Sequence, residues 1–158
     1  MRSIAFCLTL LVSIAACETT TDSLIGIPGG VAVTAAQISG NWSFTVHPSG
    51  LACTTGSLAD GQVLTARLDV LSDGSLAGTS FWQNLPTTLV RPLTGAVNLS
   101  TGFAGLLKVA APGSNAAMEL RGTMTAGGSF SGTLSDPAPG SFSVFGACSY
   151  TTTGARTG

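Results

Sequence analysis

The chain consists of short segments in which apolar and polar residues alternate, separated by turn residues. The clearest example is a hairpin predicted over Val63–Leu71 and Leu76–Trp82. In its first arm the apolar residues occupy every second position: Leu64, Ala66, Leu68 and Val70. A period of two places successive side chains on opposite faces of a β-strand. The Asp73-Gly74 pair between the arms supplies the positive φ of a tight hairpin turn. The pattern therefore predicts strands, and helical periodicity is nearly absent.

Similar segments continue along the chain. Stronger predicted strands are Ala117–Thr125, Ser129–Leu134 and Phe142–Thr152, and weaker ones are Asn41–Val46, Thr88–Leu93, Ala96–Leu99 and Gly105–Ala110. One short helical turn is expected near Thr34–Ile38. About eight to ten short strands with regular turns predict an all-β fold. We expect an antiparallel up-and-down barrel of about eight strands, with a β-sandwich as the alternative.

The N-terminal segment has a different composition from the rest of the chain. Arg2 provides a positive charge, and an apolar run over Ile4–Ala16 follows it. This run is shorter than the roughly 20 residues that a membrane-spanning helix needs. A short apolar run behind a positive charge is typical of a signal peptide.

The run ends in Ile14-Ala15-Ala16-Cys17, which resembles the lipobox of bacterial lipoproteins. The resemblance implies that residues 1–16 are removed and that Cys17 carries acyl chains such as palmitate, which hold the protein on a membrane. Glu18, where an Asp would favour the inner membrane, implies the outer membrane, with the protein facing the periplasm. The alternatives are an ordinary cleaved signal peptide and an uncleaved anchor. The predicted parts are a signal peptide (1–16), a lipidated N-terminus with a tether (17–35) and an all-β domain (36–158).

Two cysteines remain once Cys7 has left with the signal peptide and Cys17 is lipidated. Cys53 and Cys148 would then lie in an oxidising compartment, where a disulfide is expected. A bond closing a loop of about 95 residues stabilises by roughly 4–5 kcal/mol. A metal site with His47 would need more ligands than the chain offers, so no metal is expected. The disulfide would join the first and last strands, as a closed barrel requires, although a Greek-key sandwich would also allow it.

Gly40-Asn41-Trp42 opens the first predicted strand. It resembles the Gly-x-Trp motif of the calycins, the group of lipocalin-like and avidin-like barrels. The resemblance implies that Trp42 closes the barrel floor and that Arg156 packs on its ring through a cation–π contact. The alternative is that Trp42 is a core aromatic residue of another β-domain.

Composition and motifs exclude several functions. Charged residues make up 8% of the chain, against roughly 25% in typical proteins, and no basic patch indicates nucleic-acid binding. His47 precedes Pro48 in a loop-like sequence, and Asp60, Asp73 and Asp136 lie in turn settings. No phosphate loop or dinucleotide fingerprint is present. We therefore expect a protein that is not an enzyme and has no cofactor.

Two functions fit these features. The first is a calycin-like barrel that binds a small apolar ligand, with Phe81 or Trp82 lining the site. Small residues expected to point inward would leave room for that ligand: Ala66, Gly78, Gly122 and Gly132. The second is a structural or interaction lipoprotein with a filled barrel that binds an envelope protein. A cavity of several hundred Å³ would favour the first, and a filled interior with an exposed apolar patch would favour the second.

Overall fold

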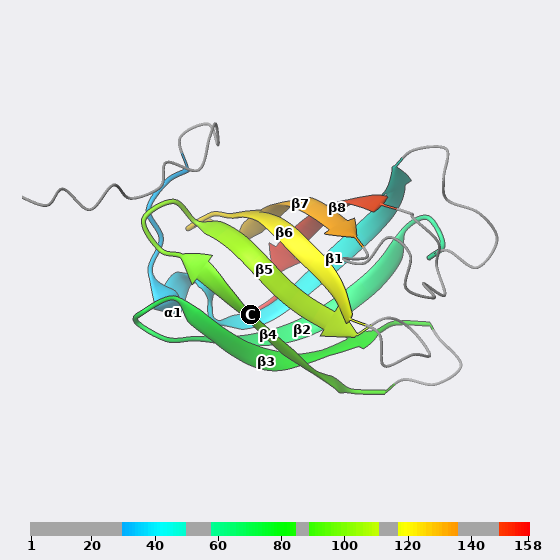
Figure 1. Cartoon of the computed structure of the whole chain (residues 1–158), viewed down its shortest axis with the longest axis horizontal. Coiled ribbons are helices and arrows are strands. Elements are labelled where there is room, and N and C mark those ends of the chain that lie inside the picture. The colour runs from blue at the N-terminus through cyan, green and yellow to red at the C-terminus, as the bar shows by residue number, and fades with distance from the viewer. Residues whose placement is uncertain (1–29, 50–57, 85–88, 111–116, 136–148) are drawn as a thin grey trace, which may run out of the picture.

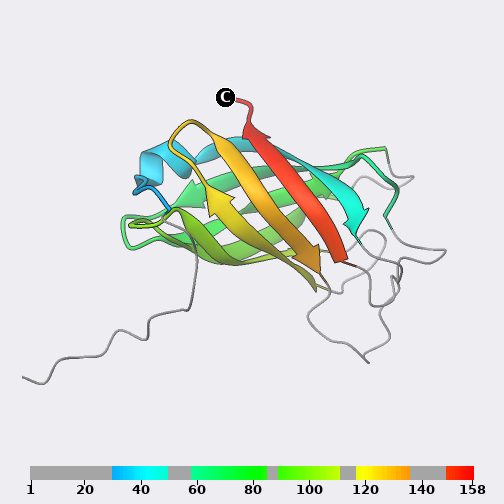
Figure 2. The ribbon, with the colours of Figure 1, turned by 90° about the horizontal axis from the view of Figure 1, so that it is seen from above.

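The computed structural model describes residues 30–49, 58–84, 89–110, 117–135 and 149–158. Eight antiparallel strands form a closed barrel in which each strand pairs with the next and β8 pairs with β1 (Figures 1 and 2). The strands are β1 (Gly40–Ser49), β2 (Gln62–Val70), β3 (Ser75–Trp82), β4 (Arg91–Asn98), β5 (Phe103–Ala110), β6 (Ala117–Met124), β7 (Ser129–Ser135) and β8 (Ser149–Arg156). The predicted up-and-down barrel is confirmed, and the sandwich alternative is wrong.

The helix α1 (Ala35–Ile38) precedes β1, where a helical turn was expected. Its start is fixed by a capping box, because the Thr34 hydroxyl accepts from the Gln37 backbone N–H while the Gln37 side chain accepts from the Thr34 N–H. Residues 30–35, which the sequence analysis placed in the tether, lie on the barrel. Val33 is buried there, and its N–H donates to the Leu99 carbonyl at 2.8 Å.

The two ends of the barrel have different connections. At the α1 end, β2–β3, β4–β5 and β6–β7 are joined by turns 71–74, 99–102 and 125–128, four residues each. Each turn finishes in a glycine with positive φ: 84° at Gly74, 68° at Gly102 and 76° at Gly128. Glycine adopts this conformation without steric cost, so the turns stay short. At the opposite end, which we call the loop end, the connections are residues 50–61, 83–90, 111–116 and 136–148.

The predicted strand boundaries differ from the structure mainly around β4. Two separate strands were predicted over Thr88–Leu93 and Ala96–Leu99, whereas the chain forms the single strand β4 across both. No strand was predicted over Thr94-Gly95. Gly95 instead lies within the sheet, paired with Leu76 on one side and Leu107 on the other. Most of the predicted strand Phe142–Thr152 lies outside the described residues.

Packed side chains fill the described interior of the barrel. Trp42 stacks on Phe44 at 5.8 Å between ring centroids, and Phe44 meets Phe130 edge-on at 5.2 Å. These three rings lie within one continuous core of buried residues. The largest fully buried side chains are Trp42, Tyr150, Phe44, Ile38, Leu64, Leu68, Leu93, Leu107, Met118, Leu120, Met124 and Leu134.

The small inward residues make space for these rings. Gly122 and Gly132 pair across β6 and β7. A Cβ added at Gly132 would lie 2.0 Å from the Arg121 carbonyl oxygen and 2.7 Å from both the Gly122 Cα and the Phe130 Cζ. The two strands therefore approach closely here, and the Phe130 ring occupies the space that side chains would otherwise take.

This packing predicts a specific sensitivity. Gly132→Ala should lower the free energy of unfolding by about 1–3 kcal/mol, because the added methyl group must displace backbone or the Phe130 ring. Gly127→Ala is the matched control: its Cβ would meet nothing closer than the Thr125 hydroxyl at 3.7 Å, and its effect should stay within about 0.5 kcal/mol. Urea unfolding of both variants provides the measurement. Equal stabilities would contradict the close packing of β6 on β7.

Candidate functional site

The charged side chains and His47 of the described residues are spread over the outer surface, whereas the Tyr150 phenol is buried in the core. His47 Nδ1 lies 2.7 Å from Asp60 Oδ1, and both side chains are well exposed. Asp73 accepts from the Ser75 hydroxyl at 2.7 Å and from the Ser75 N–H at 2.9 Å. These two bonds hold the pKa of Asp73 below its usual value and fix the turn after β2. Within the described ranges, no three His, Cys, Asp or Glu side chains gather as a metal site.

No helix in the described part of the chain is both long and apolar enough to span a membrane.

The predicted floor residues lie together at the α1 end. Trp42 is fully buried, and its indole N–H donates to the Ile38 carbonyl at 2.7 Å, which ties α1 to the barrel. Arg156 is its backbone partner on β8. The Arg156 guanidinium donates to the Gln37 carbonyl at 3.2 Å. Among the described residues, the ring that stacks on Trp42 is Phe44. The cation–π contact between Arg156 and Trp42 stays a prediction.

The two predicted ligand-lining residues lie on opposite faces of β3. Trp82 is buried inside the barrel, while its neighbour Phe81 is partly exposed. The Trp82 indole N–H donates to the Ala110 carbonyl at 2.9 Å, reaching from β3 to β5. Of the two, Trp82 is the one placed to face the interior.

The predicted lipidation and disulfide residues Cys17, Cys53 and Cys148 lie outside the described residues. For Cys53 and Cys148, the nearest described residues along the chain are Ser49 and Ser149. These two serines are backbone partners, and their hydroxyl oxygens lie 3.2 Å apart.

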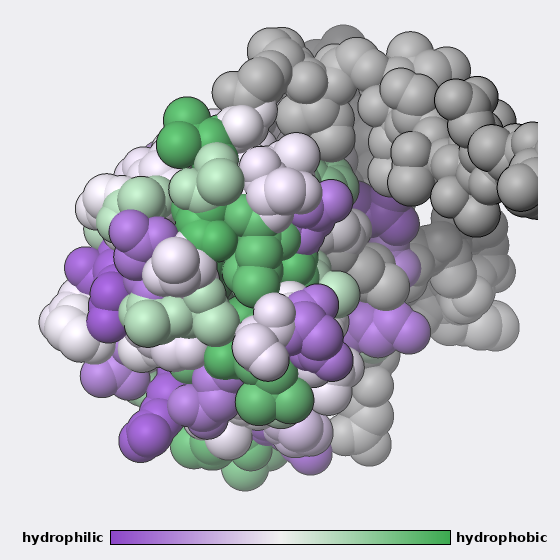
Figure 3. Space-filling view, turned by 90° about the vertical axis from the view of Figure 1, so that its left-hand side faces the viewer, coloured by the Kyte–Doolittle hydropathy of each residue, from purple (hydrophilic) through white to green (hydrophobic). Residues whose placement is uncertain are grey.

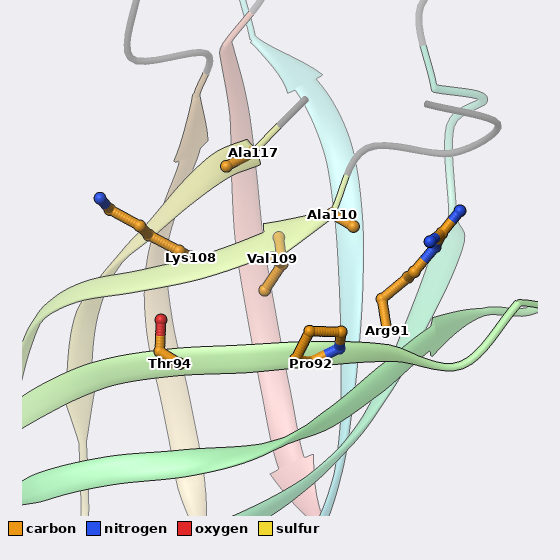
Figure 4. Close-up of a pocket in the computed structure, with 7 residues that line it drawn as sticks. All are labelled: Arg91, Pro92, Thr94, Lys108, Val109, Ala110 and Ala117. Atoms are coloured by element: carbon orange, nitrogen blue, oxygen red, sulfur yellow. The ribbon is translucent and has the colours of Figure 1, made fainter. Parts of the chain in front are cut away.

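A hollow of about 230 Å³ opens on the outer surface between β4 and β5 at the loop end (Figure 4). The two strands pair from Thr94 and Lys108 towards the α1 end, but their pairing stops before Pro92. Proline has no backbone N–H to donate to the ladder, so it favours the separation of the strands here. The lining residues are Arg91, Pro92, Thr94, Lys108, Val109, Ala110 and Ala117.

The hollow has two cations on an apolar base. Arg91 and Lys108 extend from opposite sides of it, with Val109 between them (Figure 4). Within the described residues, neither side chain forms an ion pair or a hydrogen bond. The other described cations are occupied: Arg67 by Asp69, Arg121 by Glu119 and Arg156 by the Gln37 carbonyl.

Exposed apolar residues extend this surface. Leu89 and Val90, which are 53% and 63% exposed, directly precede Arg91. We call Leu89, Val90, Arg91 and Lys108 the β4–β5 patch. The residues that line the hollow include one hydroxyl, on Thr94, but no carboxylate or imidazole that would act as a base. The arrangement therefore suits the binding of an acidic group beside an apolar one.

The β4–β5 patch was not predicted from the sequence. The feature that could have indicated it is the run Leu89-Val90-Arg91-Pro92, in which two apolar residues precede a cation and a proline. That run was interpreted only as part of the weak strand Thr88–Leu93. Lys108 is 17 residues further along the chain, and only the pairing of β4 with β5 brings it close.

No protein-family model matches this sequence, and a comparison with curated proteins finds no relative.

The indole of Trp82 bridges the place where β4 and β5 separate, and this predicts a measurable cost. Trp82→Phe should destabilise the protein by about 1–3 kcal/mol, because the partly buried Ala110 carbonyl loses its donor. Phe81→Leu on the opposite face of the same strand is the control and should cost less. Thermal and urea unfolding report both changes. If the Trp82→Phe protein is as stable as the parent, the hydrogen bond between the Trp82 indole and the Ala110 carbonyl contributes nothing to stability.

Proposed function

We propose that this protein is a non-enzymatic lipoprotein of the bacterial cell envelope, anchored through Cys17, and that it acts through the outer surface of a filled barrel. The observation that carries this proposal is the packed interior, where rings from β1 and β7 occupy the space beside the small inward residues. A small ligand needs a concave site that buries most of its surface. The packing therefore supports the structural or interaction role over ligand storage.

The β4–β5 patch is the surface that we propose for the partner. It combines two exposed apolar side chains with two cations that have no protein partner among the described residues. Burial of Leu89 and Val90 would contribute the affinity. Arg91 and Lys108 would mainly set orientation and association rate, as rim charges do. The partner is then an envelope protein that presents a carboxylate next to apolar side chains.

The calycin-like character of the barrel supports a second candidate, the binding of a small apolar ligand. Eight antiparallel strands and the buried Trp42 at the start of β1 are compatible with such a barrel. The specific observation in its favour is the Thr152 hydroxyl, which is buried and has no hydrogen-bond partner among the residues that the structure describes. A polar atom of a ligand would satisfy it. Native mass spectrometry of protein extracted from its own membranes separates the candidates, because a retained small molecule would support the second.

The pairing of β1 with β8 supports the proposed disulfide. Cys148 directly precedes Ser149, and Cys53 follows Ser49 by four residues. Because Ser49 and Ser149 are paired in the sheet, both cysteines continue from the same end of the same strand pair. A disulfide between them would tie the closing strands β1 and β8 together at the loop end.

Peptide mapping of the protein purified from membranes tests both modifications. We expect an N-terminal fragment that begins at an acylated Cys17, and a Cys53–Cys148 pair that resists alkylation until it is reduced. Cys17→Ser should remove the acyl chains and release the protein from membranes, while leaving the disulfide intact. An unmodified Cys17 would contradict the anchor, and free thiols in the native protein would contradict the bridge.

Photo-crosslinking in cells tests the partner surface. A photoreactive residue at Val90 should form one discrete adduct with an envelope protein. Charge reversal in the double variant Arg91→Glu and Lys108→Glu should reduce that adduct severalfold, because it removes the attraction to a carboxylate. Thr133 on β7, which is exposed and lies on a strand that pairs with neither β4 nor β5, provides the control position for the photoreactive residue. Equal adducts from both positions, or an adduct unaffected by charge reversal, would contradict the assignment.

A further inference from the structure

The end of the barrel that carries α1 is almost free of charge. It consists of residues 30–39 and the turns 71–74, 99–102 and 125–128, which we call the α1 face. In these ranges Asp73 is the one charged residue. The Arg156 guanidinium also reaches this end, where it donates to the Gln37 carbonyl and keeps its positive charge. With one charge of each sign the face is close to neutral, so removing it from water costs less than removing a charge-rich surface.

Apolar side chains lie exposed on the α1 face. Val31 is 71% exposed and Leu71 is 63% exposed. Figure 3, which looks at this end of the barrel, shows apolar surface there, bordered by weakly polar and by hydrophilic residues. Burial of these two side chains against another apolar surface would be favourable.

The position of Gly30 indicates what covers this face. Gly30 lies against the turn 99–102, since a Cβ added to it would overlap the Thr101 carbonyl oxygen. Twelve residues, 18–29, separate Gly30 from Cys17. A segment of that length spans at most about 40 Å. An acyl chain on Cys17 would therefore keep the α1 face close to the bilayer. Because this tether raises the effective concentration of lipid near the face, even weak contacts between the face and the headgroups would form.

We propose that the α1 face lies on the bilayer surface, with Val31 and Leu71 among the lipid headgroups, so that the β4–β5 patch points away from the membrane. This orientation rests on the proposed anchor at Cys17. Asp73 lies two residues after Leu71, and its bonds with Ser75 favour the carboxylate form. This carboxylate would locally repel anionic phosphatidylglycerol, so the turn 71–74 should prefer zwitterionic phosphatidylethanolamine.

The test uses the full mature protein, isolated with its lipid and placed in phosphatidylethanolamine-containing nanodiscs. A small fraction of the lipid carries a gadolinium chelate on its headgroup, and amide NMR signals report the distance to it by their broadening. Broadening at Val31 and Leu71 should exceed that at Leu89 and Val90 severalfold. Equal broadening at both ends, or stronger broadening at Leu89 and Val90, would overturn the orientation.

Matched double variants separate contact with lipid from tethering alone. Val31→Ser with Leu71→Ser should reduce the difference between the two ends, whereas Leu89→Ser with Val90→Ser should leave it unchanged. Replacing the zwitterionic lipid with phosphatidylglycerol should weaken broadening of the α1 face, and Asp73→Asn should restore it, since asparagine also suits this turn. If the serine pair at the α1 face has no effect, the apolar contact is wrong.

Failure of the anchor and failure of the orientation give different results. The mass of the isolated protein reports the acyl chains before any NMR measurement, so an unmodified Cys17 would reject the anchor alone. An acylated protein with even broadening would reject the orientation alone. A dimer in sedimentation that the Val31 and Leu71 variants dissociate would assign the α1 face to a second copy and would also overturn the proposal.

Discussion

Strands β1 and β8 lie at the two ends of the folded chain, and their pairing closes the barrel. Their register runs from Trp42 opposite Arg156 to Ser49 opposite Ser149. Without this pairing both strands would be open edges, which are sites of aggregation. Closure at eight strands also sets the width of the interior, which side chains alone are enough to fill. The interior then requires glycine where strands or rings come close, as at Gly132 and at Gly154, which faces Phe44.

The residues that local chemistry controls could be predicted from the sequence. Asp73-Gly74 specified its turn, Thr34 began the helix, and alternation over β2 and β6 assigned the buried faces correctly. The proposed disulfide indicated that the first and last strands are neighbours, and the structure shows these strands paired along their backbones. β4 was the main error, because Thr94-Gly95 has the local composition of a turn. Its position between β3 and β5 keeps it extended, and tertiary pairing of this kind overrides local preference.

The β4–β5 patch could not be predicted because it arises where regular pairing ends. Pro92 was visible in the sequence, but its effect depends on which strand lies beside it. With β5 as that neighbour, Lys108 and Arg91 come to lie on either side of one hollow, and the Trp82 indole reaches the Ala110 carbonyl. Under the first of the two functions considered, the inward small residues were expected to leave a cavity. Sequence spacing gives the face on which a residue lies, but it does not say which rings from distant strands will fill the space.

Because the number of strands is even, the start of β1 and the finish of β8 lie at the same end of the barrel. Here the Asn41 N–H donates to the Gly158 carbonyl, and the Thr157 N–H donates to the Asn41 carbonyl. The proposed lipid anchor would therefore join the barrel beside the three short turns, where few charges would oppose contact with lipid. The filled core separates this end from the β4–β5 patch. Substitutions in the patch can therefore occur without disturbing the end that we propose for the membrane.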